Sequence, residues 1–266
     1  MSILYTTLTL AILGIVCGLL LELAYKKLNV PTDPKVEEIS ACLGGANCGG
    51  CGYAGCDAFA KAVAEGKADS SLCVQVTPER LEQIGKIMGI EVKVAQKRVA
   101  VVLCHGCEGI AKPRYTYDGL ESCLIASQMA GGPKLCEFSC VGLGDCVKAC
   151  QFDAITIDKK LAKIDPEVCT GCGACIEVCP RNIIELLPYT QKAIVKCKNT
   201  NVARVARSAC SSACIGCKKC ERTCQHDAIH VVDGVAKVDY ATCIGCGDCV
   251  EGCPSNCIEI GPAPKI

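Results

Sequence analysis

Two stretches decide the fold of this chain of 266 residues: CTGCGACIEVCP at residues 169–180 and CIGCGDCVEGCP at residues 243–254. Both have the spacing Cys-x2-Cys-x2-Cys-x3-Cys followed by proline, and residues 214–224 have the same spacing without the proline. Three thiolates on one tight loop can bind three irons of a 4Fe–4S cluster, and the fourth cysteine then serves the other cluster of a pair. The spacing therefore predicts small domains, each built around two clusters that join its halves.

The region that contains these runs is duplicated. Eight cysteines recur 74 positions later with no insertion between them: Cys136, Cys140, Cys146, Cys150, Cys169, Cys172, Cys175 and Cys179 return as Cys210, Cys214, Cys220, Cys224, Cys243, Cys246, Cys249 and Cys253. Such a repeat indicates duplication of one structural unit. Short β-branched segments between the runs are typical of strands. We therefore expect two tandem ferredoxin-like modules of the α+β class, at residues 133–190 and 191–266.

Ligand sets follow from the rule for paired clusters. In the second module we expect one cluster on Cys214, Cys217, Cys220 and Cys253, and the other on Cys243, Cys246, Cys249 and Cys224. In the first module one matching set is Cys169, Cys172, Cys175 and Cys150. The last set departs from the pattern, because Leu143 stands where the repeat has Cys217. We expect Cys136 to substitute, which gives Cys136, Cys140, Cys146 and Cys179; an empty, degenerate site is the alternative.

A separate group of four cysteines precedes the modules, in a glycine-rich segment and after a short helical stretch: Cys48, Cys51, Cys56 and Cys73. Glycine lets backbone amides approach the sulfurs of a cluster, and such hydrogen bonds tune its potential. The group predicts a fifth 4Fe–4S cluster in a small domain at residues 35–95. From spacing alone zinc also fits, because a Cys-x2-Cys pair suits either metal.

Other cysteines have no place in these sets. Some of them can supply a sixth cluster or be packed thiols, and we favour packing because free cysteine is commonly buried and inert: Cys104, Cys107, Cys123, Cys197 and Cys210. The first three lie in a connecting segment at residues 96–132. We expect no ligand role for Cys17, Cys42 and Cys257, and surface or packing roles for His105, His226 and His230.

The N-terminus predicts a membrane anchor. The first 21 residues carry no charge and are mostly aliphatic, which is enough for a helix to cross the hydrocarbon core. Lys26 and Lys27 follow directly, so the positive-inside rule places the long C-terminal part in the cytoplasm. A cleaved signal peptide would show a basic start and a small-residue cleavage site, and neither is visible. We expect a single transmembrane helix at residues 1–25 and a linker at residues 26–34.

Composition excludes several classes of protein. With 28 basic and 28 acidic residues the formal charge is zero, so no overall field favours nucleic acid. A cysteine count of 28 would indicate a disulfide scaffold in a short secreted chain, but this chain is long and its cysteines have ligand spacing. No nucleotide fingerprint, flavin motif or catalytic triad is visible, so we expect no substrate-converting site in this chain.

One charged stretch stands out against this neutral background. Residues 192–222 carry eight lysines and arginines against a single acid, Glu221. A one-sided stretch of this kind beside the Cys214 run can attract an acidic partner. A solvated loop whose charges only keep it soluble is the alternative.

Residues 32–56, TDPKVEEISACLGGANCGGCGYAGC, follow directly on the apolar N-terminus and resemble the B subunit of the Rnf ion-translocating electron transport complex. The resemblance covers nearly the whole chain, and the duplicated module matches the longer, anaerobe-type members. It implies an electron-transfer subunit of a membrane-bound ferredoxin:NAD oxidoreductase coupled to sodium or proton translocation. It also implies a cluster, and not zinc, at Cys48, Cys51, Cys56 and Cys73.

The same resemblance implies the surroundings of the protein. Soluble ferredoxin is the expected electron donor, and other subunits of the membrane complex are the expected acceptors. The chain would cross the inner (cytoplasmic) membrane once, with its clusters on the cytoplasmic side. Two other functions remain open: a membrane polyferredoxin that serves some other reductase, and a zinc-binding scaffold.

Overall fold

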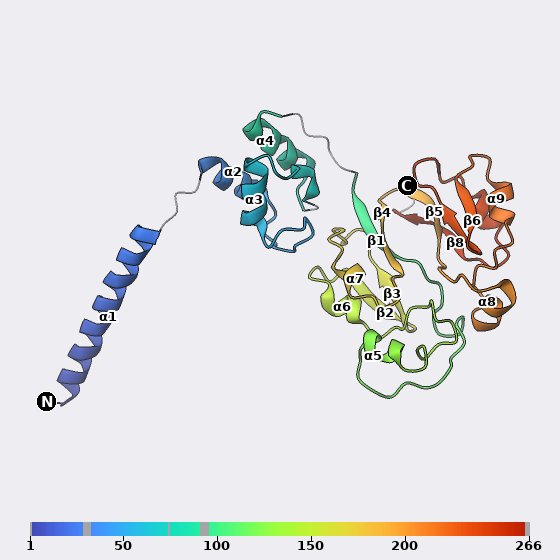
Figure 1. Cartoon of the computed structure of the whole chain (residues 1–266), viewed down its shortest axis with the longest axis horizontal. Coiled ribbons are helices and arrows are strands. Elements are labelled where there is room, and N and C mark those ends of the chain that lie inside the picture. Colours follow the sequence, from blue (N-terminus) through green and yellow to red (C-terminus); the bar gives the residue numbers. More distant parts are fainter. Residues whose placement is uncertain (1, 29–32, 74, 91–95, 264–266) are drawn as a thin grey trace.

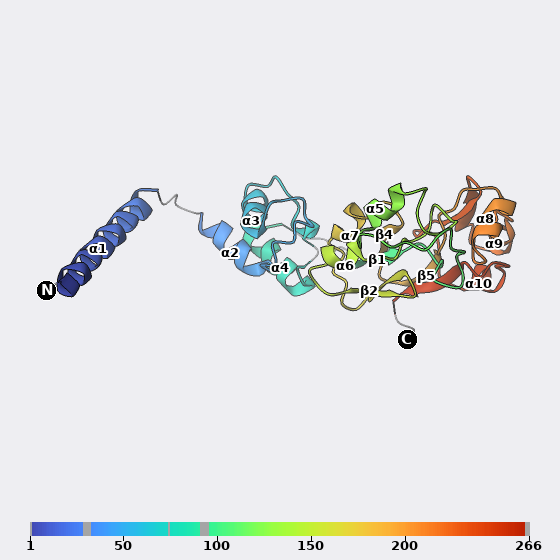
Figure 2. The same cartoon turned by 90° about the horizontal axis from the view of Figure 1, so that it is seen from below.

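The computed structural model of the chain describes residues 2–28, 33–73, 75–90 and 96–263. A long helix, a small helical domain and two α+β modules follow one another in chain order (Figures 1 and 2). The first helix, α1 (Ser2–Leu28), extends away from the rest in both views, and apolar side chains such as Leu13 and Leu20 are exposed on it. Among the residues that the structure describes, none of the helices combines the length and the apolar character that a membrane crossing needs.

The small domain consists of short helices around a limited core. Its elements are α2 (Pro34–Cys42), α3 (Cys56–Ala64), the 3-10 turn η1 (Ser70–Leu72) and α4 (Pro78–Met88). The Asp33 side chain caps α2 by accepting from the Lys35 amide at 3.0 Å, which satisfies an N–H that the helix leaves unpaired. Ile39, Phe59 and Ile84 are almost fully buried between the helices. A core of this size contributes little stability by itself, so a bound metal group would stabilise the domain substantially.

Each of the two modules is built from two antiparallel strand pairs and short helices. In module 1 the pairs are β1 (Arg98–Val102) with β4 (Ile184–Pro188) and β2 (Ile155–Asp158) with β3 (Leu161–Ile164); the helices are α5 (Cys123–Gln128), α6 (Asp145–Ala149) and α7 (Ala174–Glu177). In module 2 the pairs are β5 (Gln191–Val195) with β8 (Ile258–Pro262) and β6 (Ile229–Val232) with β7 (Val235–Val238); the helices are α8 (Ala203–Ala209), α9 (Lys219–Thr223) and α10 (Asp248–Glu251). The two modules therefore repeat one topology, as the cysteine repeat predicted.

The structure places β1 inside module 1, although the sequence analysis assigned residues 96–132 to a connecting segment. β1 pairs with β4 as β5 pairs with β8. The strands β1 and β5 start 93 positions apart, which is 19 more than the repeat of 74. Module 1 therefore carries an insertion after β1, which contains Cys107, whereas Cys104 follows β1 as Cys197 follows β5.

A partly buried ion-pair group joins the two modules. Glu259 on β8 contacts the His105 ring at 3.3 Å and the Lys196 ammonium at 3.0 Å. The His105 amide also donates to the Lys196 carbonyl at 3.1 Å. Burial opposes ionisation of Glu259, but hydrogen bonds and charge from His105 and Lys196 lower its pKa to about 2. The carboxylate therefore stays charged at neutral pH and holds the inserted segment against module 2.

Candidate iron–sulfur sites

The loop before α7 shows how a cysteine run is shaped by its glycines. Gly171 has a φ of +74°, and a Cβ built on it would overlap the Arg98 carbonyl oxygen on β1. Only glycine fits this backbone conformation and this close approach. Gly173 ends the loop in the left-handed region and α7 begins at the next residue, so Cys175 faces back towards the loop cysteines.

The sets predicted for module 2 each line one cavity. One cavity is bordered by the thiols of Cys214, Cys217, Cys220 and Cys253. The second is bordered by those of Cys224, Cys243, Cys246 and Cys249. The structure thus brings the fourth cysteine of each run to the three cysteines of the other run, as the spacing rule requires.

In module 1 the regular run is assembled in the same way. Burial, together with the neighbouring thiols of Cys169, Cys172 and Cys150, raises the pKa of the Cys175 thiol to about 12. The Cys169 sulfur accepts a hydrogen bond from the Ala100 amide on β1 at 3.4 Å. The four predicted cysteines of this set therefore lie together, with β1 supplying a backbone donor.

The irregular set of module 1 differs from the sequence-based expectation. Its cavity is lined by Cys123, Cys140, Cys146 and Cys179, and Cys136 does not border it. Burial raises the pKa of the Cys146 thiol to about 12, and Cys123 is among the neighbouring thiols that add to the shift. The structure thus places Cys123, and not Cys136, where the cysteine missing at Leu143 would be needed.

A hydrogen-bonded helix start explains the position of Cys123. The Asp145 carboxylate on α6 accepts from the Ser122 hydroxyl at 3.1 Å and from the Leu124 amide at 3.2 Å. These two contacts fix the first turn of α5 over α6, and Cys123 lies between them. No short sequence motif could predict this contact, because Asp145 lies more than twenty positions after Ser122 and Leu124.

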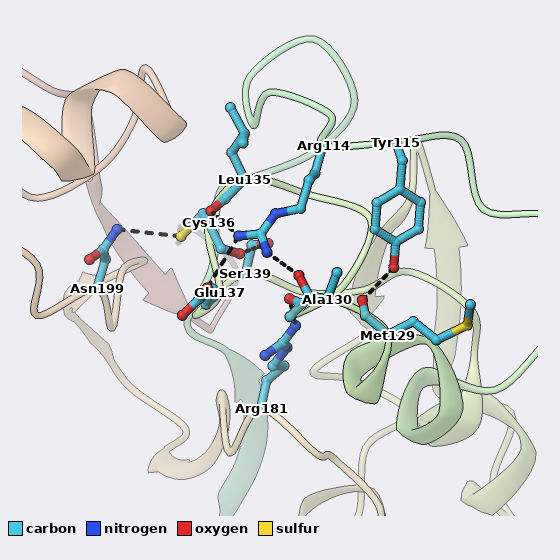
Figure 3. Close-up of polar contacts among 11 residues, drawn as sticks. Arg114, Tyr115, Met129, Ala130, Leu135, Cys136, Glu137, Ser139, Arg181 and Asn199 are labelled. Atoms are coloured by element: carbon cyan, nitrogen blue, oxygen red, sulfur yellow. Dashed lines mark hydrogen bonds and ion pairs between the residues drawn. The ribbon is translucent and has the colours of Figure 1, made fainter.

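Cys136 lies instead at the boundary with module 2 (Figure 3). Its sulfur accepts a hydrogen bond from the Asn199 side chain at 3.4 Å, and Asn199 is almost fully buried. The adjacent loop is held by the Arg114 guanidinium, which donates to the carbonyl oxygens of Ala130 and Leu135. Cys136 is therefore a buried, hydrogen-bonded thiol outside the cavity of Cys140.

In the small helical domain all four predicted cysteines border one cavity: Cys48, Cys51, Cys56 and Cys73. The Asn47 side chain accepts from the Cys56 amide at 2.7 Å and so closes the glycine-rich loop onto the start of α3. Burial raises the pKa of the Cys73 thiol, and the other three thiols raise it further. The four sulfurs are thus close enough to repel one another when ionised.

The glycine-rich loop of this domain also touches module 1. A Cβ built on Gly50 would lie 3.1 Å from both the Cα atom and the carbonyl oxygen of Cys172. Gly50 therefore lets the loop that carries Cys48 and Cys51 lie directly on a cysteine of the neighbouring set. The two cysteine groups meet backbone to backbone at this point.

These arrangements fit iron–sulfur clusters in their donor chemistry. Several thiols share each cavity, raise one another's pKa and accept backbone N–H groups, so their ionisation needs a positively charged metal group. In the described ranges of the chain, no group of three or more His, Cys, Asp or Glu side chains is placed to hold a single metal ion. The fit to a cluster therefore rests on sulfur donors that border a common cavity.

The remaining predicted residues are placed as follows. Cys257 is almost fully buried beside Cys253, with 3.6 Å between the sulfurs, and its hydrogen bond to Cys214 lowers the pKa of the Cys214 thiol. Cys42 lies 3.8 Å from the Gln83 side-chain oxygen, and Cys17 is exposed on α1. His230 lies within 4 Å of two carboxylates and His226 is exposed.

The basic stretch divides into two groups. Lys192, Lys196 and Lys198 are half-buried and bind, respectively, the Tyr240 carbonyl, Glu259 and Glu185. The other five basic side chains are exposed on α8 and near α9: Arg204, Arg207, Lys218, Lys219 and Arg222. Cys217 is exposed beside the last three. We call these five exposed side chains the basic face; three of them, Lys218, Lys219 and Arg222, adjoin the surface end of the Cys214 set at Cys217.

Comparisons with known proteins agree with this arrangement. Residues 43–75 match the family described as a putative Fe–S cluster, and residues 139–203 and 213–257 match the 4Fe–4S dicluster domain. The chain is 42% identical to the B subunit of the Na(+)-translocating ferredoxin:NAD(+) oxidoreductase complex of Acetobacterium woodii, over 94% of this chain and 75% of the relative. It is 36% identical to the B subunit of the ion-translocating oxidoreductase complex of Methanosarcina acetivorans, over 94% and 96%. A proton-translocating counterpart from Clostridium ljungdahlii is 35% identical, over 86% and 82%.

Proposed function

Because the chain belongs to the family of B subunits of ion-translocating oxidoreductase complexes, we propose that it relays single electrons within a membrane-bound ferredoxin:NAD oxidoreductase. Each 4Fe–4S cluster, when bound, takes up one electron and releases it again. The chain would accept electrons from reduced ferredoxin and pass them to partner subunits in the membrane. The hydride and ion-translocation steps would belong to those partners.

The observation that carries the proposal is the common pattern of the cysteine sets. Four cavities are each bordered by the four cysteines of one set, with Cys257 as an additional neighbour in one of them, and a fifth set surrounds Cys175. An electron relay needs several such sites close together. We assign the ligands to Cys48, Cys51, Cys56 and Cys73; Cys123, Cys140, Cys146 and Cys179; Cys150, Cys169, Cys172 and Cys175; Cys214, Cys217, Cys220 and Cys253; and Cys224, Cys243, Cys246 and Cys249.

The protein's own contribution is to position and tune these sites. Backbone amides such as those of Ala100 and Ala228 donate to the ligand sulfurs of Cys169 and Cys224, at 3.4 Å and 3.5 Å. Such donors stabilise the more negative, reduced state and raise the potential of a site. The contact of Gly50 with Cys172 supports a direct path between the small domain and module 1.

Docking of the donor is assigned to the basic face. Its five cations are exposed, and Cys217 brings a ligand of the Cys214 set to the surface among them. Soluble ferredoxins are typically acidic, and opposite charge raises the rate at which partners meet. An electron could therefore pass to the Cys214 set without crossing a thick layer of protein.

The membrane anchor is assigned to the N-terminal helix on sequence grounds. Residues 1–21 are uncharged and Lys26 and Lys27 follow, so the helix would cross the membrane once and leave the cluster-binding parts in the cytoplasm. Deletion of residues 1–25 should release the chain from washed membranes while leaving its iron content unchanged. Retention of the truncated chain on membranes that lack the partner subunits would refute this assignment.

Metal analysis tests the proposal directly. Anaerobically purified protein should contain at least about twenty iron atoms and as many acid-labile sulfides, four for each of five clusters. Stoichiometric zinc with little iron would overturn it in favour of a zinc scaffold. Purification in complex with membrane subunits, together with ferredoxin-dependent reduction of NAD, separates the proposed function from that of a free polyferredoxin.

A further inference from the structure

Three cysteines outside the five sets lie together where the two modules meet. Cys104, Cys136 and Cys210 are each only 6% exposed. Burial, together with the neighbouring thiols of Cys104 and Cys136, raises the pKa of the Cys210 thiol to about 11. The Cys104 thiol also contributes to the raised pKa of the Cys136 thiol. The three sulfurs are therefore mutual neighbours, although Cys104 follows β1, Cys136 lies later in module 1 and Cys210 belongs to module 2.

Backbone pairing explains how residues so far apart converge. The inserted segment 110–114 lies between segment 133–135 of module 1 and segment 209–211 of module 2. On one side the Lys112 amide donates to the Ala209 carbonyl at 2.9 Å, and Ala111 forms an antiparallel bridge with Cys210. On the other side the Leu135 amide donates to the Lys112 carbonyl at 2.9 Å. The insertion thus acts as a short central strand that aligns Cys136 with its repeat partner Cys210.

We assign Cys107 as the fourth member of this group, in place of Cys197, which also packs beside Cys136 and Cys210. Cys107 follows Cys104 in a Cys-x2-Cys turn, the spacing that places two thiols on one loop. The Cys107 carbonyl accepts from the Ala111 amide at 3.0 Å, so Cys107 is one turn away from the bridge between Ala111 and Cys210. The loop that carries Cys104 and Cys107 is therefore tied directly to the strand contact that positions Cys210.

Hydrogen-bond donors reach these sulfurs as they reach those of the five sets. The Cys104 sulfur accepts from the Gly106 amide at 3.2 Å, and the Cys210 sulfur accepts from the Ser212 amide. In the assigned sets, the sulfurs of Cys73 and Cys214 likewise accept a hydrogen bond from the backbone amide two residues later in the chain, that of Gln75 and that of Gly216. Cys136 has an additional donor in Asn199, which reaches across from module 2 (Figure 3).

A buried cation lies beside the same group. Lys134 is 6% exposed and donates to the Gly106 and Lys160 carbonyl oxygens, both at 2.7 Å. The thiol of Cys140, from the neighbouring set, and those of Cys104, Cys107 and Cys210 are the groups within charge range of its ammonium. A buried ammonium is costly without a nearby negative charge. Thiolates around a cluster on this group would supply such charge, in addition to that of the Cys140 set.

We propose that Cys104, Cys107, Cys136 and Cys210 bind a sixth 4Fe–4S cluster at the junction of the two modules. Each thiol would release its proton as its sulfur bonds one iron, so the site would carry negative charge against Lys134. The site rests on the proposed electron-relay function and extends it, because it joins the clusters of module 1 to those of module 2. It would also cross-link the insertion to both modules.

Counting irons decides between this site and packed thiols. We expect about twenty-four irons and twenty-four sulfides per chain, and a native mass that corresponds to six clusters. The Cys107→Ser variant should contain about four irons fewer and lack one reduced-cluster signal in electron paramagnetic resonance. The matched variant Cys197→Ser, which changes another buried thiol of the same region, should keep all of them. The native mass of the unaltered chain gives the number of clusters directly, so the test does not depend on the folding of a variant.

Several results would overturn the site. Five clusters in the unaltered chain would do so while leaving the proposed function intact, whereas little iron altogether would refute that function itself. Loss of four irons in Cys197→Ser but not in Cys107→Ser would show that the fourth ligand is wrongly assigned. One zinc ion that disappears in Cys107→Ser would show that the four thiols bind a different metal.

Discussion

Cys123 and Cys197 lie 74 positions apart, as the repeat does, but in the structure the counterpart of Cys197 is Cys104, whose sulfur accepts the amide of Cys140 at 3.5 Å. Cys123 borders a cavity with Cys140, whereas the corresponding cavity of module 2 is completed by Cys217. The Cys197 sulfur instead accepts the amide of Cys214 at 3.3 Å. Cys123 therefore supplies a proposed ligand, whereas its partner in the sequence repeat, Cys197, is a packed thiol.

This difference predicts an asymmetric response to substitution. Cys123→Ser should lose about four irons, because a hydroxyl is a poor replacement for a thiolate ligand of a cluster. Cys197→Ser should lose none. Iron and sulfide analysis of the two variants, purified side by side without oxygen, gives the measurement.

A double variant separates this assignment from the sequence-based one. Cys123→Ser combined with Cys136→Ser should lose about eight irons, because the two cysteines belong to different proposed sets. A loss of only four would mean that both serve one cluster. A full iron content in Cys123→Ser would return the role to Cys136, as the spacing alone had suggested.

Cys257 offers a second test at the level of one side chain. It donates a hydrogen bond to the Cys214 sulfur, and the equivalent residue of module 1 is Ile183. Cys257→Val should keep all irons but make the potential of one cluster more negative. A hydrogen bond is worth about 1 kcal/mol, so the shift should be on the order of tens of millivolts.

Redox titration followed by electron paramagnetic resonance measures this shift. The reciprocal variant Ile183→Cys serves as the control, because it introduces a thiol at the same position of module 1 and should move a potential in the positive direction. Loss of iron from Cys257→Val would instead make Cys257 a ligand. An unchanged set of potentials would show that its hydrogen bond has no influence on the site.

At the scale of elements, the contact between the small domain and module 1 depends on one glycine. The φ of Gly50 lies outside the left-handed region, so a larger residue is allowed by its backbone and excluded only by Cys172. Gly50→Val should push the loop away from Cys172 and slow electron transfer between the two sites several-fold, since tunnelling falls steeply with distance. Iron content should not change.

The control for this variant lies in the same loop. Ala54 is exposed, so Ala54→Val adds the same side chain without touching module 1. Rapid freeze-quench spectroscopy of the assembled complex would follow arrival of electrons at the Cys48 set. Equal rates in the two variants would exclude the Gly50 contact as part of the electron path.

How far the elements could be predicted depended on whether their contacts are local. The ligand sets of the regular runs follow from spacing, because three thiolates on one loop are fixed by a few backbone angles. Cys123 could not be placed in this way, since its position depends on contacts of α5 with Asp145 on α6. The β-branched run at residues 99–102 predicts the strand β1, but its place in module 1 was hidden by the insertion that follows it.

At the scale of the whole molecule, the proposed sites follow one another along the long axis. Figure 2 shows α1, the small domain, module 1 and module 2 in that order from one end to the other. The helices α8 and α9, which carry most of the basic face, lie at the end farthest from α1 in both views. A donor that docks there would deliver electrons at the end opposite to the proposed membrane anchor.

Charge reversal tests this direction of flow. Changing Lys218, Lys219 and Arg222 to Glu should slow ferredoxin-driven reduction roughly tenfold at low salt, because the acidic donor would be repelled from Cys217. The salt dependence should also weaken, since attraction between exposed charges is what salt screens. Iron content should stay constant, because the three side chains are exposed and none is a proposed ligand.

A matched triple variant in the small domain controls for net charge. Lys61, Arg80 and Lys86 are also exposed, and changing them to Glu alters the total charge by the same amount at the other end of the cluster chain. Stopped-flow reduction by ferredoxin over a range of ionic strengths should distinguish the two variants, with only the module 2 variant slow and insensitive to salt. If both variants keep the parent rate and slope, the donor docks elsewhere, and module 1 is the next surface to test. If the small-domain variant alone is slow, electrons reach the chain beside the Cys48 set, and the direction of flow proposed for the molecule is reversed.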